Sequence, residues 1–317
     1  MFARKFAAGL TGICAILLLS AQAALAQAPP PGPGRGPAMN PEIPQNAGIK
    51  VSDHVHAIMA FPNIFIVTGT RATLVVDTGL GPAEGAIVAT EAQKLAKNQI
   101  LYLTTTHYHP EHAAGDAGFP SNTILVRPAI QQQEIEKDGM RMVGMFSGMN
   151  ARNAELLKDV KFRAPDIVFD KETTLDLGGV TAKIFWLGPA HTSGDELIYV
   201  NPDKALISGD IVQNKMLPNP IGAGSSLTSW INILAQLKTM DIRYVDPDHG
   251  ALGDGSLITD EYNFLNDLKT RTLDLKRQGK SADEAGPIVA SDLKTKYPAW
   301  PNNGVPGLVG HIYSENP

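Results

Sequence analysis

Short apolar runs alternate with longer amphipathic stretches along most of this chain. Apolar runs bounded by turn-forming residues are typical of buried strands, whereas an apolar stripe that repeats every three to four residues is typical of helices. The pattern predicts strands at 51–60, 63–69, 72–78, 100–106, 122–126, 181–187, 196–201, 204–208 and 243–246. It predicts helices at 82–97, 128–138, 150–158, 226–240, 256–278 and 281–296. Strands mixed with helices indicate an α/β protein in which helices cover the outer faces of the sheets.

Methionines interrupt this pattern between residues 139 and 151. Met140, Met142, Met145 and Met149 occur within ten residues, in a chain that has nine methionines. One interpretation is a helix whose adaptable side chains pack on the core. The other is an apolar lid or wall beside a binding site for an apolar substrate. The sequence leaves both interpretations open.

The N-terminal region has the composition of a targeting segment. A short basic region at Arg4 and Lys5 precedes an apolar run at 10–20. Ala24-Leu25-Ala26 then has the small-x-small pattern of a cleavage site. The prediction is a signal peptide at 1–26, a Pro/Gly-rich disordered linker at 27–46 and one folded domain at 47–317. The apolar run is too short to span a bilayer well, so we expect no stable membrane anchor and a periplasmic or secreted location.

Charge and cysteine content narrow the classes of function. The only cysteine, Cys14, lies in the predicted signal peptide, so we expect no disulfide and no thiolate ligand in the mature chain. Removal of Arg4 and Lys5 from the 27 basic residues leaves 25 against 32 acidic residues, a net charge of −7. A protein with this net negative charge is poorly suited to bind nucleic acid or an anionic lipid surface. A small-molecule substrate is expected instead.

A cluster of potential metal ligands follows the predicted strand at 100–106. His107, His109, Glu111 and His112 fall within six residues, although the whole chain has eight histidines. A turn at the end of the strand would let His107 and His109 point to the same side. Neutral imidazole nitrogens and a carboxylate oxygen are ligands that a divalent ion such as zinc prefers. The run therefore predicts a metal site.

The spacing His107-x-His109-x-Glu111-His112 resembles the H-x-H-x-D-H signature of the metallo-β-lactamase fold superfamily, with Glu in the usual place of Asp. Further segments between residues 50 and 275 follow in the order of that family. They are opening strands at 63–67 and 73–79, a histidine motif at 188–194, an aspartate segment at 208–210, and 246–250, where Asp248 replaces a Gly of the family's P-G-H-G element. The resemblance implies an αββα sandwich of two mixed sheets flanked by helices, with the site along one sheet edge.

The resemblance also implies a ligand set for two metal ions. The matching positions are His107, His109 and His191 for the first ion, Glu111, His112 and His249 for the second, and Asp210 between the two. Zinc is the expected cofactor, and iron or manganese is compatible with the same ligands. Asp77 either orients the motif loop and fixes a histidine tautomer or only caps a turn. His54 and His56 are expected to face solvent or a polar patch.

The function that the resemblance implies is that of an exported, metal-dependent hydrolase. A divalent ion lowers the pKa of a bound water to near neutrality, so that a metal-bound hydroxide attacks an ester, lactone, thioester or β-lactam. β-Lactamases of this fold usually carry Cys or Ser at the position of Asp210, and an Asp there is more typical of ester and thioester hydrolases. Asp210 and Glu111 are the catalytic candidates that would handle the proton.

Glu111 keeps other functions open. Its side chain has one more methylene than Asp, so its carboxylate reaches further and is less fixed. It would either bind the second ion or act as a general acid or base over a single ion. The remaining alternatives are a mononuclear iron dioxygenase that acts on a persulfide and a degenerate member that binds metal without turnover. Metal content and oxygen uptake distinguish the dioxygenase from the hydrolase.

Overall fold

The computed structural model describes residues 42–222 and 224–316, and these residues belong to one compact unit. The predicted signal peptide and residues 27–41 of the predicted linker lie outside the described residues. The rest of that linker contacts the domain. Ile43 is buried and its N–H donates to Glu84 (2.6 Å), and the N–H of Asn46 donates to Glu91 (3.0 Å). The packed part of the chain therefore begins before residue 47.

The first sheet has the strand order β1-β2-β3-β4-β5-β6-β7. Its strands are β1 (Gly48–Lys50), β2 (Val55–Ile58), β3 (Ile64–Thr68), β4 (Thr73–Val76), β5 (Leu101–Thr104), β6 (Ile124–Pro128) and β7 (Ile167–Phe169). The pairs from β1 to β4 are antiparallel, whereas the pairs from β4 to β7 are parallel. The sheet is therefore mixed.

The second sheet has the order β12-β11-β10-β9-β8. Its strands are β8 (Glu172–Asp176), β9 (Thr181–Phe185), β10 (Leu197–Asn201), β11 (Ala205–Gly209) and β12 (Tyr244–Pro247). Only the pair of β11 and β12 is parallel. Because β9 and β11 are both antiparallel to β10, the carboxyl ends of β9, β11 and β12 point to the same edge of this sheet.

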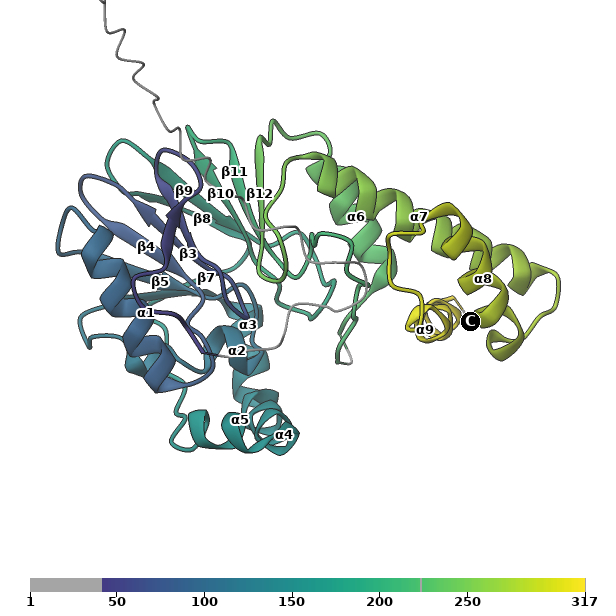
Figure 1. Ribbon diagram of the computed structural model, residues 1–317, viewed down its shortest axis with the longest axis horizontal. Helices are drawn as coiled ribbons and strands as arrows, with labels where there is room; N and C mark the ends of the chain where they lie inside the picture. The colour runs from purple at the N-terminus through teal and green to yellow at the C-terminus, as the bar shows by residue number, and fades with distance from the viewer. Residues whose placement is uncertain (1–41, 223, 317) are drawn as a thin grey trace, which may run out of the picture. The chain divides into compact units, whose positions relative to one another are not determined.

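Helices cover the outer faces of both sheets (Figure 1). They are α1 (Pro82–Leu95), α2 (Pro110–Ala113), α3 (Ala129–Glu134), α4 (Met140–Met149), α5 (Ala151–Leu156), α6 (Leu227–Leu237), α7 (Ser256–Arg277), α8 (Ala282–Lys296) and α9 (Val305–Glu315), with a π-helical turn at Ile135–Gly139 between α3 and α4. Helix α1 lies beside the first sheet, and α6 and α7 lie beside the second. The αββα sandwich implied by the resemblance is confirmed. Among the described residues, no helix combines the length and the apolar character needed to cross a membrane.

The layers are joined by three apolar cores. The inner faces of the sheets meet through alternating residues, such as Phe65 and Val67 of β3 and Ile198 and Val200 of β10. A second core lies between the first sheet and α1. A third fills the space between the second sheet and α6 to α9. The alternation of strand side chains between two faces explains why one strand contributes to two cores.

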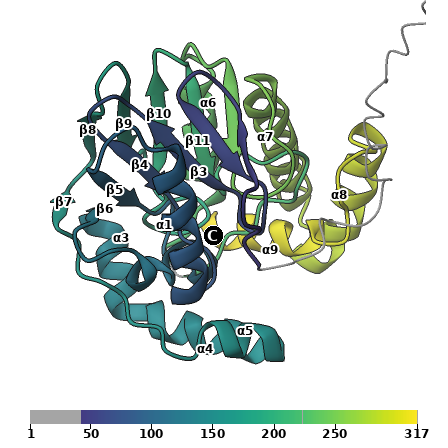
Figure 2. The same ribbon diagram turned by 60° about the vertical axis from the view of Figure 1, so that its left-hand side comes forward.

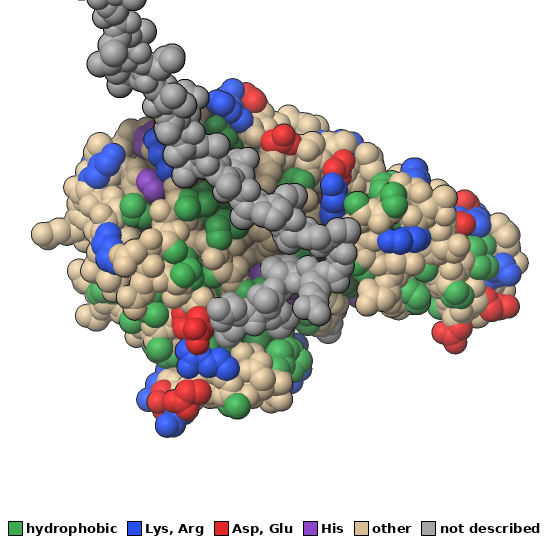
Figure 3. Space-filling view, viewed as in Figure 1, with side chains coloured by type: hydrophobic (Ala, Val, Ile, Leu, Met, Phe, Trp, Pro, Cys, Tyr) green, Lys and Arg blue, Asp and Glu red, His purple; other side chains and the backbone are tan. Residues whose placement is uncertain are grey.

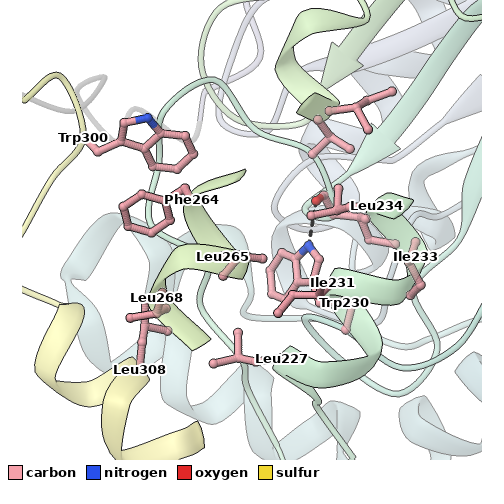
Figure 4. Close-up of a cluster of buried hydrophobic side chains, with 14 of the residues drawn as sticks. Leu227, Trp230, Ile231, Ile233, Leu234, Phe264, Leu265, Leu268, Trp300 and Leu308 are labelled. Atoms are coloured by element: carbon pink, nitrogen blue, oxygen red, sulfur yellow. Dashed lines mark hydrogen bonds between the residues drawn. The ribbon is translucent and has the colours of Figure 1, made fainter. Parts of the chain in front are cut away.

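Helix α6 connects the third core to the edge of the second sheet. Ser226 caps the helix, as expected, by accepting the N–H of Ser229 (3.1 Å). Figure 4 shows Trp230 among the leucines and isoleucines of this core, with a dashed hydrogen bond from its indole. That bond is donated by Nε1 to the carbonyl of Ile211 (2.8 Å). Core packing therefore fixes the backbone directly after Asp210.

Several elements differ from the prediction. The run at 51–60 is one strand and a preceding turn, because the N–H groups of Val51 and Ser52 both bond to the carbonyl of Val55. Strands β1, β7 and β8 were missed because they are edge strands with largely exposed side chains. Helices α2 and α9 were also missed. The first is four residues long, and the second carries glycines that weaken a helical pattern.

Candidate metal centre

The predicted ligands all follow the carboxyl ends of strands. His107 to His112 follow β5, His191 follows β9, Asp210 follows β11, and His249 follows β12. The strand directions bring these loops to one edge of the sandwich. There the candidate ligand atoms of His107, His109 and His191 lie within 4.8 Å of one another, as do those of Glu111, His112 and His249. We call these two sets the first group and the second group.

The first group consists of three buried imidazoles. Nδ1 of His109 lies 3.0 Å from Nε2 of His107 and 3.1 Å from Nε2 of His191. Nδ1–H of His191 donates to the carbonyl of Asn219 (2.5 Å), which leaves its Nε2 free to face the group. Burial, and then the neighbouring imidazoles, hold the pKa of His107 and His109 well below the usual range. These rings are therefore neutral at neutral pH, as metal binding requires.

Asp210 lies between the two groups. One carboxylate oxygen, Oδ2, is 3.3 Å from Nε2 of His191, and the other, Oδ1, is 3.4 Å from Nε2 of His249. Burial disfavours its ionised form, but the attraction of His249 and His191 outweighs burial and lowers its pKa below the usual value. The side chain is therefore an anion that faces one imidazole of each group.

Glu111 completes the second group. Its Oε1 is 3.7 Å from Nε2 of His112, and the side chain is buried. Burial raises the pKa of Glu111 to about 7. The longer side chain thus reaches the place at which the family's Asp was expected, and in the metal-free protein it gains or loses a proton near neutral pH.

The donor set fits a divalent cation. Oε2 of Glu111, Nε2 of His112 and Oδ1 of Asp210 are buried and have no hydrogen-bond partner among the described residues. Buried polar atoms without partners are costly, and a bound cation would satisfy them. In the first group, zinc–nitrogen bonds of about 2.0–2.1 Å in tetrahedral geometry place nitrogens roughly 3.3 Å apart, close to the spacing found here. The arrangement therefore suits one ion in each group.

Asp77 orients the motif loop and does not merely cap a turn. The N–H of Thr106 donates to its Oδ1 (2.7 Å), and Nδ1–H of His112 donates to its Oδ2 (2.9 Å). All three side chains are buried. A proton fixed on Nδ1 leaves Nε2 of His112 available as the ligand atom. Asp77 is in the left-handed backbone region (φ 70°), directly after β4.

The structure adds residues that the sequence did not point to. Asp248, which the sequence marked only as a departure from the family, lies with its Oδ2 at 3.3 Å from Nδ1 of His112. Asp195 accepts both the N–H and the hydroxyl of Thr192 and so fixes the turn around His191. Glu134 accepts the N–H of Ser193 in the same loop (2.9 Å). A single sequence offers no local signal for contacts between segments so far apart.

Two aromatic side chains flank the groups. Phe61 stacks on the ring of His249, with ring centroids 4.2 Å apart, and Phe146 of α4 lies 6.3 Å from the ring of His109. Figure 2 shows α4 and α5 together beyond α3, at one end of the sheets. Apolar side chains are visible in the same place at the lower edge of Figure 3.

Helix α4 contains the methionine segment for which two interpretations were open. Met142 is buried in the local core, whereas Met140, Met145 and Met149 are 42–59% exposed. The segment is thus a helix that packs on the core through one face. The same face carries Phe146, which forms an apolar wall beside the first group. The packing interpretation is confirmed for this face, whereas a lid or wall for an apolar substrate stays a prediction.

The other histidines lie outside the two groups. His54 precedes β2, and its Nδ1–H donates to Asp203 (2.6 Å), so its surroundings are a polar patch as expected. His56 is on β2 and is partly buried. His311 of α9 forms an ion pair with Glu315 (3.2 Å).

Comparison with known proteins agrees with this architecture. Residues 59–249 match the model of the metallo-beta-lactamase superfamily, so the chain belongs to this superfamily. It is 24% identical over 127 residues to the metallo-beta-lactamase type 2 of Bacteroides fragilis and 25% identical over 173 residues to the acyl-coenzyme A thioesterase MBLAC2 of Homo sapiens. These matches cover 39% and 49% of this chain, and 51% and 60% of the relatives' own length.

Solved structures show the same fold. A metallo-beta-lactamase from Pontibacter korlensis aligns with a TM-score of 0.55 at 20% identity, over 69% of this chain and 98% of that chain. The stereoselective inverting sec-alkylsulfatase Pisa1 from Pseudomonas sp. aligns with a TM-score of 0.65 at 15% identity, over 85% of this chain and 50% of that chain. At these identities the likeness concerns the fold alone.

Proposed function

We propose that the protein is a hydrolase that uses two divalent ions, with zinc as the first choice. The observation that carries this proposal is the position of Asp210. Its two carboxylate oxygens lie 3.3 and 3.4 Å from imidazole nitrogens that belong to different groups. An anion placed in this way would hold two cations close together, as two-metal hydrolases require.

The residues form two ligand sets, and two of these residues are also candidates for proton transfer. The first group would hold one ion, the second group would hold the other, and Asp210 would contact both. When bound, such ions lower the pKa of water and polarise the bond that is attacked. Glu111 is one candidate to accept or deliver a proton, wherever its carboxylate does not itself bind the second ion. Asp210 is the second candidate for this role.

The proposed substrates are small molecules with an ester, thioester, lactone or β-lactam bond. An Asp at position 210 supports the ester and thioester classes, and one relative is named as an acyl-coenzyme A thioesterase. Phe61 and Phe146 flank the two groups and favour substrates with an apolar substituent beside the reacting bond. No nucleic acid is proposed as a substrate.

Metal analysis combined with a panel of chromogenic substrates tests this function. We expect about two divalent ions in the purified protein and hydrolysis of at least one ester, thioester, lactone or β-lactam. A chelator should abolish turnover, and added zinc should restore it. Absence of bound metal would contradict the proposal. Bound iron with oxygen uptake and no hydrolysis would contradict it as well and would favour the dioxygenase alternative.

We also propose that the protein is exported and that its mature form begins at Gln27. The support is the order of basic, apolar and Ala24-Leu25-Ala26 elements in the sequence. N-terminal sequencing of periplasmic or secreted protein checks this proposal. An intact Met1 on protein that fractionates with membranes would contradict it.

A further inference from the structure

The two loops that form the first group are joined by a side chain that belongs to neither of them. Gln131 lies on α3 and is fully buried. Its Oε1 accepts the hydroxyl of Thr105 (2.6 Å), and its Nε2 donates to the carbonyls of Thr105 (2.7 Å) and Gly194 (3.3 Å). Thr105 lies two positions before His107. Gly194 lies three positions after His191, so one amide group holds the loop after β5 and the loop after β9 together.

Helix α3 comes close to the loop after β9 because residue 194 has no side chain. A Cβ atom at Gly194 would lie 2.8 Å from both N and Cα of Gln131, closer than packed atoms allow. Further along the same helix, Oε1 of Glu134 accepts the N–H of Ser193 (2.9 Å). Helix α3 therefore contacts this loop at two places, and Gln131 extends the contact to the loop after β5.

The hydrogen bonds fix the orientation of the Gln131 amide. Two backbone carbonyls face Nε2, and a carbonyl accepts only from a donor, so a flipped amide would bring its oxygen against both of them. With Nε2 placed in this way, the hydroxyl of Thr105 has to donate to Oε1. The side chain carries no charge, so these bonds do not depend on pH near neutrality. Gln131 is therefore a neutral link between the two loops.

The relative position of the two loops sets the spacing of the first group. Two of its histidines follow β5 and the third follows β9, and Nδ1 of His109 lies 3.1 Å from Nε2 of His191. Metal sites hold their ligands to within about 0.2 Å of the ideal distance, so a small rotation of one loop would weaken binding. The loops also meet where the N–H of Glu196 donates to the carbonyl of Thr106 (2.6 Å), but a single bond leaves rotation about it free. Gln131 bonds to a different residue of each loop and so restricts this rotation.

We propose that Gln131 is a positioning residue that holds His191 at the right distance from His109 and so strengthens binding of the ion in the first group. This inference rests on the proposed metal-dependent function, in which the first group binds an ion. Among the hydrogen bonds of the described residues, Gln131 has none to a candidate ligand, so it acts through Thr105 and Gly194. A purely structural role would instead weaken both groups alike, through overall stability.

The variant Gln131→Met separates these roles. Met has a similar length and makes no strong hydrogen bond, so the loops lose their link while the space stays filled. We expect the zinc dissociation constant of the first group to rise about tenfold, the lower end of the range for groups that orient metal ligands. The second group should keep its affinity, because none of its ligands lies on the loop after β9. With cobalt(II) in place of zinc, the visible spectrum of the first group should change, because it reports the ligand geometry.

Thr105→Val is a graded form of the same test. It removes the hydroxyl that donates to Gln131 and leaves both carbonyl contacts of the amide in place. It should therefore weaken the first group less than Gln131→Met does.

Gln132→Met is the matched control. Gln132 is the next residue of α3, and its side chain accepts from Arg127 and donates to Glu136 (both 2.9 Å) rather than bonding to either loop. Its replacement should leave both zinc affinities and the cobalt spectrum like those of the parent. Leu293→Ala, in the core between the second sheet and α6 to α9, is the control for stability, since it should lower the melting temperature without changing the preference between the groups. If Gln131→Met does not fold, Gln131→Glu provides the same test, because a carboxyl group has at most one O–H and cannot donate to both carbonyls.

Zinc titrations of the metal-free proteins give the result, with the NMR signals of Nδ1–H of His191 and of His112 reporting the first and the second group. A weaker first group in Gln131→Met, with the second group unchanged and Gln132→Met like the parent, supports the proposal. First-group binding by Gln131→Met equal to that of the parent would overturn it while leaving the proposed hydrolase intact. Equal weakening of both groups together with a lower melting temperature would show a structural role only and would overturn it as well. A parent whose first group stays empty would overturn both the inference and the proposed metal centre.

Discussion

The two ligand groups differ in chemistry, although they lie side by side on one sheet edge. The first group has three imidazoles and no carboxylate, and a backbone carbonyl orients His191. The second group contains the carboxylate of Glu111, and two further carboxylates orient His112. Carboxyl groups are thus concentrated around the second group. The comparison teaches that the first ion would depend on imidazoles alone, whereas the second would depend on buried groups that exchange protons near neutral pH, and so be more sensitive to pH.

The largest expected effect is the loss of the first group. His109→Ala removes the imidazole that lies 3.0 and 3.1 Å from the other two. Because a metal ion contributes several kcal/mol to the transition state, turnover should fall at least about 1,000-fold. Metal counting should show that the first ion is lost. Full activity with both ions retained would show that the groups are assigned incorrectly.

The second-largest expected effect is a difference between the two groups in the pH dependence of zinc affinity. A proton on Glu111 competes with the second ion, and the pKa of this group in the metal-free protein is about 7. Burial lowers the pKa of His112, but Asp77 and Asp248 outweigh burial and raise it well above the usual range, so a proton on His112 competes with the same ion. Second-ion affinity should therefore fall by about tenfold or more per unit as the pH drops below 7. The first ion should change less between pH 7 and 6, since the pKa of His107 and His109 is well below the usual range. Zinc titrations at several pH values, with Glu111→Gln as the control that lacks this proton, measure the difference.

Glu111→Asp should change the affinity of the second ion by a smaller amount. The shorter side chain loses less conformational entropy when it is fixed, so the second ion should bind more tightly by about tenfold at most. The parent should load zinc in two steps and lose one ion early to a mild chelator. Equal and tight binding of both ions by the parent, with no change in Glu111→Asp, would show that Glu111 is an ordinary ligand.

The smallest effect concerns the aromatic walls. Phe61→Ala removes the ring that stacks on His249, and Phe146→Ala removes the one beside His109. Each change should raise KM several-fold for substrates with an apolar acyl group, since an apolar contact is worth roughly 1–3 kcal/mol. Acetyl substrates, which have little apolar surface, serve as the comparison. An equal loss for long and short acyl groups would exclude a role of these rings in substrate selection.

Local sequence patterns predicted much of the fold and the centre of the site. The apolar runs at 63–69, 72–78 and 196–201 correspond to β3, β4 and β10, because the strands are buried and bounded by turn residues. The ligand run after β5 was visible because its residues are adjacent in the chain. The roles expected for its members came from resemblance to the superfamily. The family match over residues 59–249 confirms that resemblance.

Tertiary structure decided what depends on segments that are far apart. Edge strands β7 and β8 have too few buried side chains to give a pattern, and they exist because a neighbouring strand pairs with them. The contact of Thr106 with Asp248 spans 142 positions. The stacking of Phe61 on His249 likewise joins loops that precede β3 and follow β12. The sequence by itself pointed to the candidate ligands that follow β5, since the spacing within one loop is local. Only the fold decided which carboxylates and rings surround them, because parallel strand ends bring those loops together.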